Sequence, residues 1–236
     1  MFIIQKGNNL TMLNITKKIP GESAKDYVVR QLTNNIIHIN LAPGQKLDAT
    51  ELCSELNVSK NPLREAELEL SQSRLVEIRP KVGVFVSLID TSLVEQIREL
   101  RSILEAEVAI CACDTLNAEQ INQLWENVAL WQMYIKRNDE EKIFLYDKQF
   151  HESIYRMCGK DFWYDLIGKT TPHFDRTTIL SFRCNDSDRI LKDHEELLTA
   201  IEHHDKQTAG DISRRHLTRY SENIAAIKAA YPQYFK

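Results

Sequence analysis

Residues 59–70, SKNPLREAELEL, have the features of a short helix with a polar N-terminal end. Ser59 is a favoured N-cap residue, and Pro62 falls in the first turn, where its missing N–H does little harm. Strong helix formers follow as far as Leu70. The N-terminal end therefore offers hydrogen-bond donors and positive charge, which suit phosphate groups and base edges. These features predict a helix that contacts DNA, through Ser59, Lys60, Asn61 and Arg64.

The segments before this helix complete a helix-turn-helix. Apolar residues recur at helical spacing over 23–39 and stop at a Pro-Gly turn, which predicts a first helix. Asp48 and Glu51 have the spacing of a capping box, so a short helix should follow over 49–56. Only a tight connection then remains before Ser59, as a helix-turn-helix requires.

The segment after this helix has the pattern of a β-hairpin. Apolar residues alternate with charged or small residues over 76–78 and again over 82–86, on either side of a turn at Pro80-Lys81. Three helices followed by a two-stranded hairpin predict a winged helix-turn-helix domain over residues 23–89. Residues 1–22 are expected to form an N-terminal tail or arm.

Three stretches of this region carry a family resemblance. They are LAPGQKL (41–47), ATELCSELNVSKNPLREAELEL (49–70) and RLVEIRPKVGVFV (74–86). Together they resemble the DNA-binding domain of GntR-family bacterial regulators. The sequence departs from the usual family pattern at Lys60 (usually Arg), Glu67 (usually apolar), Arg74 (commonly Gly) and Lys81-Val82 (often Gly-Arg).

The resemblance implies a set of DNA contacts. It assigns Arg64 to a guanine edge or an adjacent phosphate, and Ser59, Lys60 and Asn61 to phosphate or base contacts. Thr50 and Lys81 are expected to contact the DNA backbone. The alternative is that Ser59 only caps the helix and that Arg64 only pairs with an acid such as Glu67. Because one winged domain supplies few contacts, we expect a homodimer on a two-fold symmetric, double-stranded operator.

The remaining residues, 90–236, have the pattern of an all-helical domain. A helix over 92–114 is indicated by Ser92, with Glu95 at capping-box spacing, and by an apolar stripe. Five further helical segments are predicted over 118–136, 139–158, 161–180, 186–205 and 207–230. The chain as a whole is therefore predicted to be mainly α.

This second region resembles the FCD ligand-binding domain of the FadR subfamily of GntR regulators. The resemblance rests on IRELRSILEAEVA (97–109), YDKQFHESIYRMCG (146–159), DHEELLTAIEHHD (193–205) and SRRHL (213–217). A count of six helices favours the shorter, VanR-like type of this domain.

Four residues in these stretches form a candidate metal site. Asp147 and His151 are four positions apart, so a helix places both on one face, while His194 and His216 come from later helices. The four positions match the Asp and three His that bind metal in metal-containing FCD domains. Such a ligand set suits zinc first, with nickel, iron or manganese as alternatives, and leaves room for an anionic ligand. The alternative is a solvated helix face. The other histidines, His38, His173, His203 and His204, are not expected to bind metal.

Arg101 is the candidate effector-binding residue. In FCD domains the matching Arg commonly faces the ligand cavity, where a guanidinium can hold a carboxylate through two hydrogen bonds. The alternative is a helix-surface ion pair with Glu105. The leading hypothesis is a ligand-responsive transcriptional regulator, not an enzyme, whose metal-containing pocket senses a small organic acid. A metal-dependent enzyme acting on such an acid is the competing hypothesis, and a metal-free effector pocket is the third.

Composition is consistent with an intracellular regulator. Residues 1–86 carry 11 Lys and Arg against 9 Asp and Glu, a net charge of +2, whereas the remaining residues carry 19 against 25, a net charge of −6. This asymmetry favours a DNA-facing module joined to an acidic control module. No apolar run approaches the ~18 residues of a membrane helix. The five cysteines form no CxxC pair, so we expect reduced thiols and a cytoplasmic protein.

Overall fold

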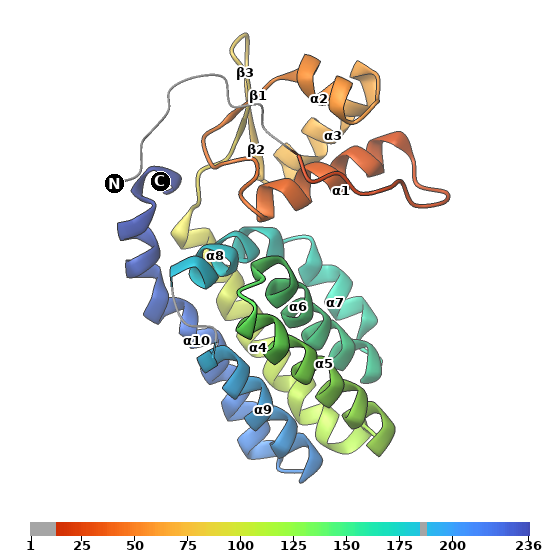
Figure 1. Cartoon of the computed structure of the whole chain (residues 1–236), viewed down its shortest axis with the longest axis vertical. Coiled ribbons are helices and arrows are strands. Elements are labelled where there is room, and N and C mark those ends of the chain that lie inside the picture. The colour runs from red at the N-terminus through yellow and green to blue at the C-terminus, as the bar shows by residue number, and fades with distance from the viewer. Residues whose placement is uncertain (1–12, 185–187) are drawn as a thin grey trace. The chain divides into compact units, whose positions relative to one another are not determined.

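A computed structural model of the chain describes residues 13–184 and 188–236 (Figure 1). The chain forms two compact units, and the boundary lies between Ser87 and Leu88. The first unit is a winged helix-turn-helix and the second is a helical bundle, so the protein is mainly α as predicted.

Residues 13–87, the described part of the first unit, form three helices and a small sheet. They are α1 (Ala24–Ile37), β1 (Lys46–Leu47), α2 (Ala49–Glu55), α3 (Lys60–Gln72), β2 (Val76–Arg79) and β3 (Gly83–Val86). The Ser23 and Asp48 side chains cap α1 and α2 by accepting hydrogen bonds from first-turn N–H groups. The strand order is β1-β3-β2, with both pairs antiparallel. The expected two-stranded hairpin is therefore extended by a third strand, which is too short to leave an alternating sequence pattern.

Two departures from the family pattern lie where the backbone is left-handed. Arg74 has φ of 61° and Lys81 has φ of 62°, a region that glycine occupies more easily than residues with a Cβ. Arg74 lies between α3 and β2, and Lys81 lies at the tip of the β2–β3 hairpin. The family's frequent glycines at these positions thus have a backbone reason, and this chain accepts local strain instead.

Glu67 is a polar residue at an apolar position of α3. It was considered as a partner of Arg64, but it is 9% exposed and has no hydrogen bond or ion pair among the residues that the structure describes. Burial raises the pKa of its carboxyl group. By contrast, Glu69 forms an ion pair with Lys25 of α1, with 2.8 Å between the charged atoms.

The segment that precedes α1 is attached to it by side-chain amides. Asn35 Oδ1 accepts a hydrogen bond from the backbone N–H of Asn14, and the Asn35 amide donates to the Asn14 carbonyl. Gln31 makes the same pair of bonds with the backbone of Thr16. These bonds fix residues 14–16 along α1. The rest of the expected arm, residues 1–12, lies outside the described residues.

The second unit contains seven α-helices within the described residues, and a final 3-10 turn (Figure 1). They are α4 (Thr91–Thr115), α5 (Ala118–Lys136), α6 (Glu140–Met157), α7 (Asp161–Gly168), α8 (Thr171–Cys184), α9 (Asp188–Glu202) and α10 (Lys206–Ala230), with the turn at Pro232–Tyr234. The expectation of six helices was wrong, so the helix count no longer favours a VanR-like type. Asp90, and not Ser92, caps α4.

The error in the helix count lies in the segment 161–180. Pro172 cannot donate a backbone hydrogen bond to the carbonyl of Gly168, and its ring would clash with that carbonyl in a continuous helix. The chain therefore ends α7 at Gly168 and begins α8 at Thr171. The Thr171 hydroxyl donates to the Gly168 carbonyl over 3.2 Å and satisfies it.

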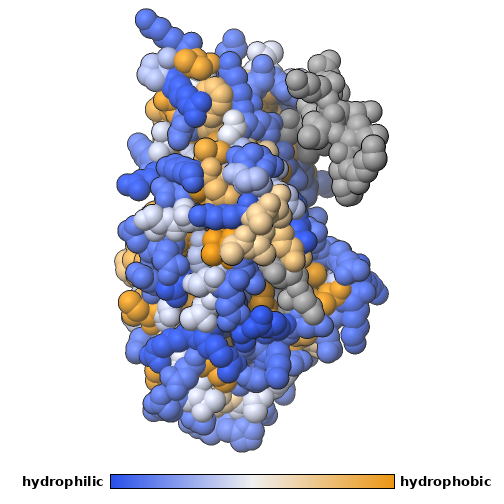
Figure 2. All heavy atoms as spheres, turned by 90° about the vertical axis from the view of Figure 1, so that its left-hand side faces the viewer, coloured by the Kyte–Doolittle hydropathy of each residue, from blue (hydrophilic) through white to orange (hydrophobic). Residues whose placement is uncertain are grey.

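Helix α4 is the centre of the bundle. It packs most extensively against α10 and also contacts α6, α8 and α9. Polar side chains cover most of the face that carries α10 (Figure 2). No described helix combines the length and apolar character needed to cross a membrane. All five cysteines are free thiols, as expected.

Candidate metal centre

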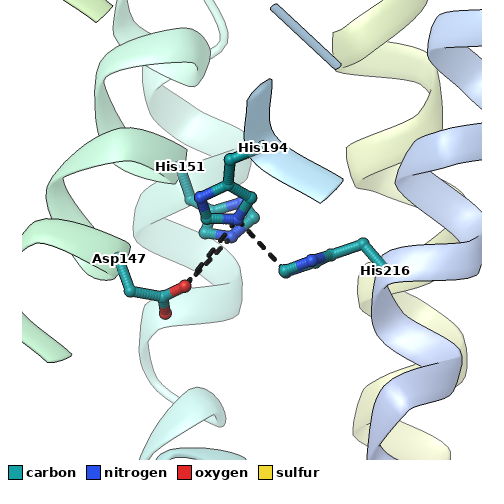
Figure 3. Close-up of side chains that lie close together, drawn as sticks. All are labelled: Asp147, His151, His194 and His216. Atoms are coloured by element: carbon teal, nitrogen blue, oxygen red, sulfur yellow. Dashed lines mark hydrogen bonds and ion pairs between the residues drawn. The ribbon is translucent and has the colours of Figure 1, made fainter. Parts of the chain in front are cut away.

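Three helices bring the four candidate metal ligands together. Helix α6 supplies Asp147 and His151 from one face, α9 supplies His194, and α10 supplies His216. One ligand atom from each residue can be chosen so that all four lie within 4.8 Å of one another. Asp147 and His216 point toward the other two histidines from opposite sides (Figure 3). The sequence-predicted residues therefore converge on one point.

The distances between these atoms match the size of a metal site. His194 Nε2 lies 3.4 Å from His216 Nε2, and Asp147 Oδ1 lies 3.8 Å from both His151 Nε2 and His194 Nε2. In a tetrahedral site with bonds of about 2.1 Å, ligand atoms are separated by roughly 3.4 Å. His151 Nε2 is also buried without a hydrogen-bond partner among the described residues, and a bound cation would satisfy it. The residues present therefore fit a divalent metal ion.

Two of the histidines have carboxylates behind them. His151 Nδ1 lies 3.1 Å from Glu105 Oε2, and His216 Nδ1 lies 3.7 Å from Asp193 Oδ2. Neither proximity is a hydrogen bond in the structure, because Glu105 Oε2 and His216 Nδ1 are both buried without a hydrogen-bond partner among the described residues. A carboxylate near the far nitrogen nevertheless favours a proton there and leaves Nε2 as the ligand, which is the usual arrangement around metal-binding histidines.

His194 is held by aromatic side chains. Its ring stacks on Phe150 with 4.2 Å between centroids, and Trp131 lies against it at 4.5 Å. Burial, together with the neighbouring charges of His216, His151 and Arg101, lowers the pKa of His194 well below its usual value. The ring is therefore neutral at pH 7, the form in which an imidazole binds metal.

A cavity of about 50 Å³ adjoins the metal ligands Asp147 and His216. Arg101 lines this cavity. The same guanidinium forms an ion pair with Glu105, with 2.7 Å between the charged atoms and both side chains buried. Arg101 can therefore both line the cavity and pair with Glu105, because this ion pair is buried in the unit and does not lie on the helix surface. Burial opposes ionisation of Glu105, but the charges of Arg101 and His151 hold its pKa well below its usual value.

The histidines not expected to bind metal lie outside the cluster. They are His38, His173, His203 and His204. His173 is buried within α8.

The six DNA-contact candidates are all exposed in the first unit. Ser59, Lys60 and Asn61 lie at the N-terminal end of α3, Arg64 lies one turn further, and Thr50 and Lys81 lie on α2 and on the hairpin tip. Ser59 occupies the N-cap position but makes no capping hydrogen bond with its side chain. No ion pair of Arg64 is found in the part of the chain that the structure describes. Neither observation supports the alternative that Ser59 only caps the helix and that Arg64 only pairs with an acidic residue.

Sequence reasoning missed the carboxylates behind the histidines. Glu105 was considered only as a partner of Arg101, and Asp193 was not considered. Asp193 is adjacent in sequence to His194 but contacts His216 of another helix, so local spacing carried no signal for it.

Comparison with known protein families identifies both units. Residues 24–86 match the bacterial regulatory proteins of the gntR family, and residues 96–219 match the FCD domain. The protein therefore belongs to the GntR family of transcriptional regulators that carry a C-terminal FCD domain.

Individual relatives agree with this assignment. The HTH-type transcriptional repressor RspR of Escherichia coli K12 is 26% identical over 221 residues, which cover 93% of this chain and 97% of RspR. The gluconate operon transcriptional repressor of Bacillus licheniformis is 25% identical over 185 residues, 76% of each chain. Among solved structures, E. coli McbR/YncC superposes with a TM-score of 0.76 at 20% identity and covers 89% of this chain and 99% of that one, so it shares the fold.

Proposed function

We propose that this protein is a homodimeric, metal-containing transcriptional regulator whose DNA binding responds to a small organic acid. The observation that carries the proposal is the convergence of Asp147, His151, His194 and His216 beside a cavity lined by Arg101. Relatives named as transcriptional repressors favour a regulator over the competing metal-dependent enzyme. Since operator DNA lies in the bacterial cytoplasm, we place the protein there.

In this proposal Asp147, His151, His194 and His216 hold one divalent ion. Three imidazoles and one carboxylate favour zinc, with nickel, iron and manganese as alternatives. When bound, the ion supplies a positive centre that can accept an oxygen atom of an acid. The protein's own part is to orient the acid, because Arg101 can direct free N–H groups toward a carboxylate from the cavity wall.

The cavity limits the size of the acid. A volume of about 50 Å³ accommodates roughly four groups the size of a water molecule. Hydroxyl and amide groups of Thr177, Ser181 and Asn223 also line it, so a hydroxylated acid would find partners. The name of the Bacillus relative, a gluconate operon repressor, is consistent with a hydroxylated acid in its chemistry, although gluconate itself is larger than this cavity.

On DNA, the N-terminal end of α3 would enter the major groove. Arg64 would contact a guanine or an adjacent phosphate, with Ser59, Lys60 and Asn61 beside it and with Thr50 and Lys81 on the backbone. A homodimer would place two such helices on the half-sites of a two-fold operator, and the acid would act by changing their relative placement.

The DNA part of the proposal is tested with an operator selected from random DNA by the purified protein. Arg64→Ala should weaken binding to that operator by about 1–3 kcal/mol while leaving the fold unchanged. Arg214→Ala, which removes an exposed positive charge from the second unit, is the matched control and should bind as the wild type does. Equal affinity of the Arg64→Ala and wild-type proteins would remove Arg64 from the interface.

The effector part is tested by a thermal-shift screen of short carboxylic and hydroxy acids on the metal-loaded protein. A ligand that binds the folded state raises the apparent melting temperature by mass action. The acid that does so should lose its effect in Arg101→Gln. An unchanged shift in that variant would exclude Arg101 from the binding site.

A further inference from the structure

Glu105 of α4 has contacts on both of its carboxylate oxygens. Oε1 accepts a hydrogen bond from Arg101 Nε over 2.7 Å, and Oε2 lies 3.1 Å from His151 Nδ1. Glu105 is 6% exposed, so both contacts are shielded from water. We call Arg101, Glu105 and His151 the Glu105 bridge.

Asp193 of α9 occupies an equivalent position on the other side of the cluster. Its Oδ2 accepts a hydrogen bond from Arg219 Nε over 2.9 Å and lies 3.7 Å from His216 Nδ1. Asp193 is 1% exposed, and Oδ1 accepts further bonds from Arg215 and Arg219. We call Arg219, Asp193 and His216 the Asp193 bridge.

Both bridges connect the candidate metal site to the cavity wall. At one end are the candidate metal ligands His151 and His216, and at the other are Arg101 and Arg219, which both line the cavity. Each buried carboxylate therefore joins one imidazole of the metal site to one guanidinium of the cavity wall. A carboxylate needed only to neutralise an arginine would not have to contact a metal ligand as well.

We propose that Glu105 and Asp193 are positioning residues that couple the cavity to the metal ion. This inference rests on the proposed function, because it requires a metal ion at the histidines. The negative charge of each carboxylate favours a proton on the nearby Nδ1, so that Nε2 is left for the ion, and each carboxylate also holds an arginine at the cavity wall by a hydrogen bond. An anion that engages Arg101 or Arg219 weakens that arginine's hold on the carboxylate. Occupancy of the cavity and affinity for the metal therefore change together, and by linkage the effect is reciprocal.

The contribution of the carboxylates to metal binding is tested with zinc alone. Glu105→Gln and Asp193→Asn keep the shape of the side chain, but an amide has one oxygen and cannot accept hydrogen bonds as both carboxylate oxygens do. Each variant should bind zinc roughly 10–100-fold more weakly than the wild type in competition with a chromophoric chelator. The visible absorption spectrum of the cobalt-substituted protein should also change, because the histidine is no longer held in one orientation.

The control is Asp114→Asn. Asp114 is a carboxylate of α4, as Glu105 is, and it forms an ion pair with Lys206. It belongs to neither bridge. Its loss should leave zinc affinity within about twofold of the wild type.

The coupling itself is tested by double-mutant cycles, again with zinc alone. Arg101→Gln removes a positive charge near the metal in both the wild-type protein and the Glu105→Gln variant. It should change the orientation of His151, however, only where the Glu105 carboxylate is present to connect the two residues. Its effect on zinc affinity should therefore differ severalfold between the wild-type and Glu105→Gln backgrounds. The same holds for Arg219→Gln with and without Asp193→Asn. The crossed pair Arg101→Gln with Asp193→Asn spans both bridges and should be additive within about twofold.

Several results would overturn the coupling. One is zinc affinity within twofold of the wild type in both carboxylate variants, and another is additivity within each bridge. Circular dichroism establishes that each variant is folded, and the two bridges supply independent tests if one variant is not. Failure of the wild-type protein to bind any zinc would instead contradict the proposed function on which the inference rests.

Discussion

Arg101→Met should markedly destabilise the second unit. The substitution leaves the buried Glu105 carboxyl without its cationic partner, since Arg101 and Glu105 form an ion pair of 2.7 Å in which the two side chains are only 8% and 5% exposed. Breaking a buried pair by removing one partner decreases the free energy of unfolding by about 3–5 kcal/mol. For a unit of this size, each kcal/mol corresponds to roughly 2–4 °C, so the melting temperature should fall by on the order of 6–20 °C.

The assay follows from the distribution of tryptophan. Trp125, Trp131 and Trp163 are the three tryptophans of the chain, and all belong to the second unit. Their fluorescence during thermal and urea unfolding, with a chelator present to keep metal out, reports on that unit. Arg214→Met is the control, because its ion pair with Asp211 is exposed, at 50% and 59%, and its loss should change stability by less than about 1 kcal/mol.

A double variant separates the charge effect from lost packing. Arg101→Met with Glu105→Leu replaces both charges by apolar groups, so it should be more stable than Arg101→Met alone. A loss below about 1 kcal/mol in the single variant would refute the view that this ion pair is buried and unscreened. Additive destabilisation in the double variant would show that packing, and not the unpaired carboxylate, accounts for the loss.

Two further predictions concern the first unit, and both are measured by hydrogen exchange of α3 amides in the whole protein. Arg74→Gly should raise stability by roughly 0.5–1 kcal/mol, since glycine relieves the left-handed backbone at φ of 61°, and Arg74→Ala should bring no such gain. Glu67→Gln should stabilise the unit at pH 7, because burial raises the pKa of Glu67 above its unfolded value of 4.5 and the unfolded chain therefore ionises first as pH increases. The advantage of Gln should shrink as pH falls below about 4, where Glu67 is protonated in both states; a stabilisation that does not depend on pH would show that ionisation is not its cause.

The helix-turn-helix could be predicted because its signals are local. The caps at Ser23 and Asp48 and the start of α3 at Lys60 each depend on residues within one turn of the chain. The break between α7 and α8 was equally local, since Gly168 and Pro172 are four residues apart, and the prediction of one continuous helix over 161–180 overlooked this signal. Strand β1 could not be recognised because a two-residue strand has no period.

The candidate metal site was predictable for a different reason. The spacing of Asp147 and His151 is a helical signal, but His194 and His216 were assigned through family resemblance, and the structure brings all four together. The partners behind the histidines are set by packing between helices. Glu105 of α4 reaches His151 of α6, and Asp193 of α9 reaches His216 of α10. Residues that meet across two helices have no fixed spacing in the sequence, so these pairs could not be recognised from it.

The most direct test of the account is the metal content of protein purified without a nickel column. Elemental analysis after dialysis should find close to one transition-metal ion per chain, with zinc expected first. The ion should be absent from the His151→Ala/His216→Ala double variant, whose tryptophan fluorescence should still report a folded second unit. A wild-type protein that binds no zinc, nickel, iron or manganese stoichiometrically, or a double variant that keeps its metal, would contradict the central claim that these four side chains form a metal centre.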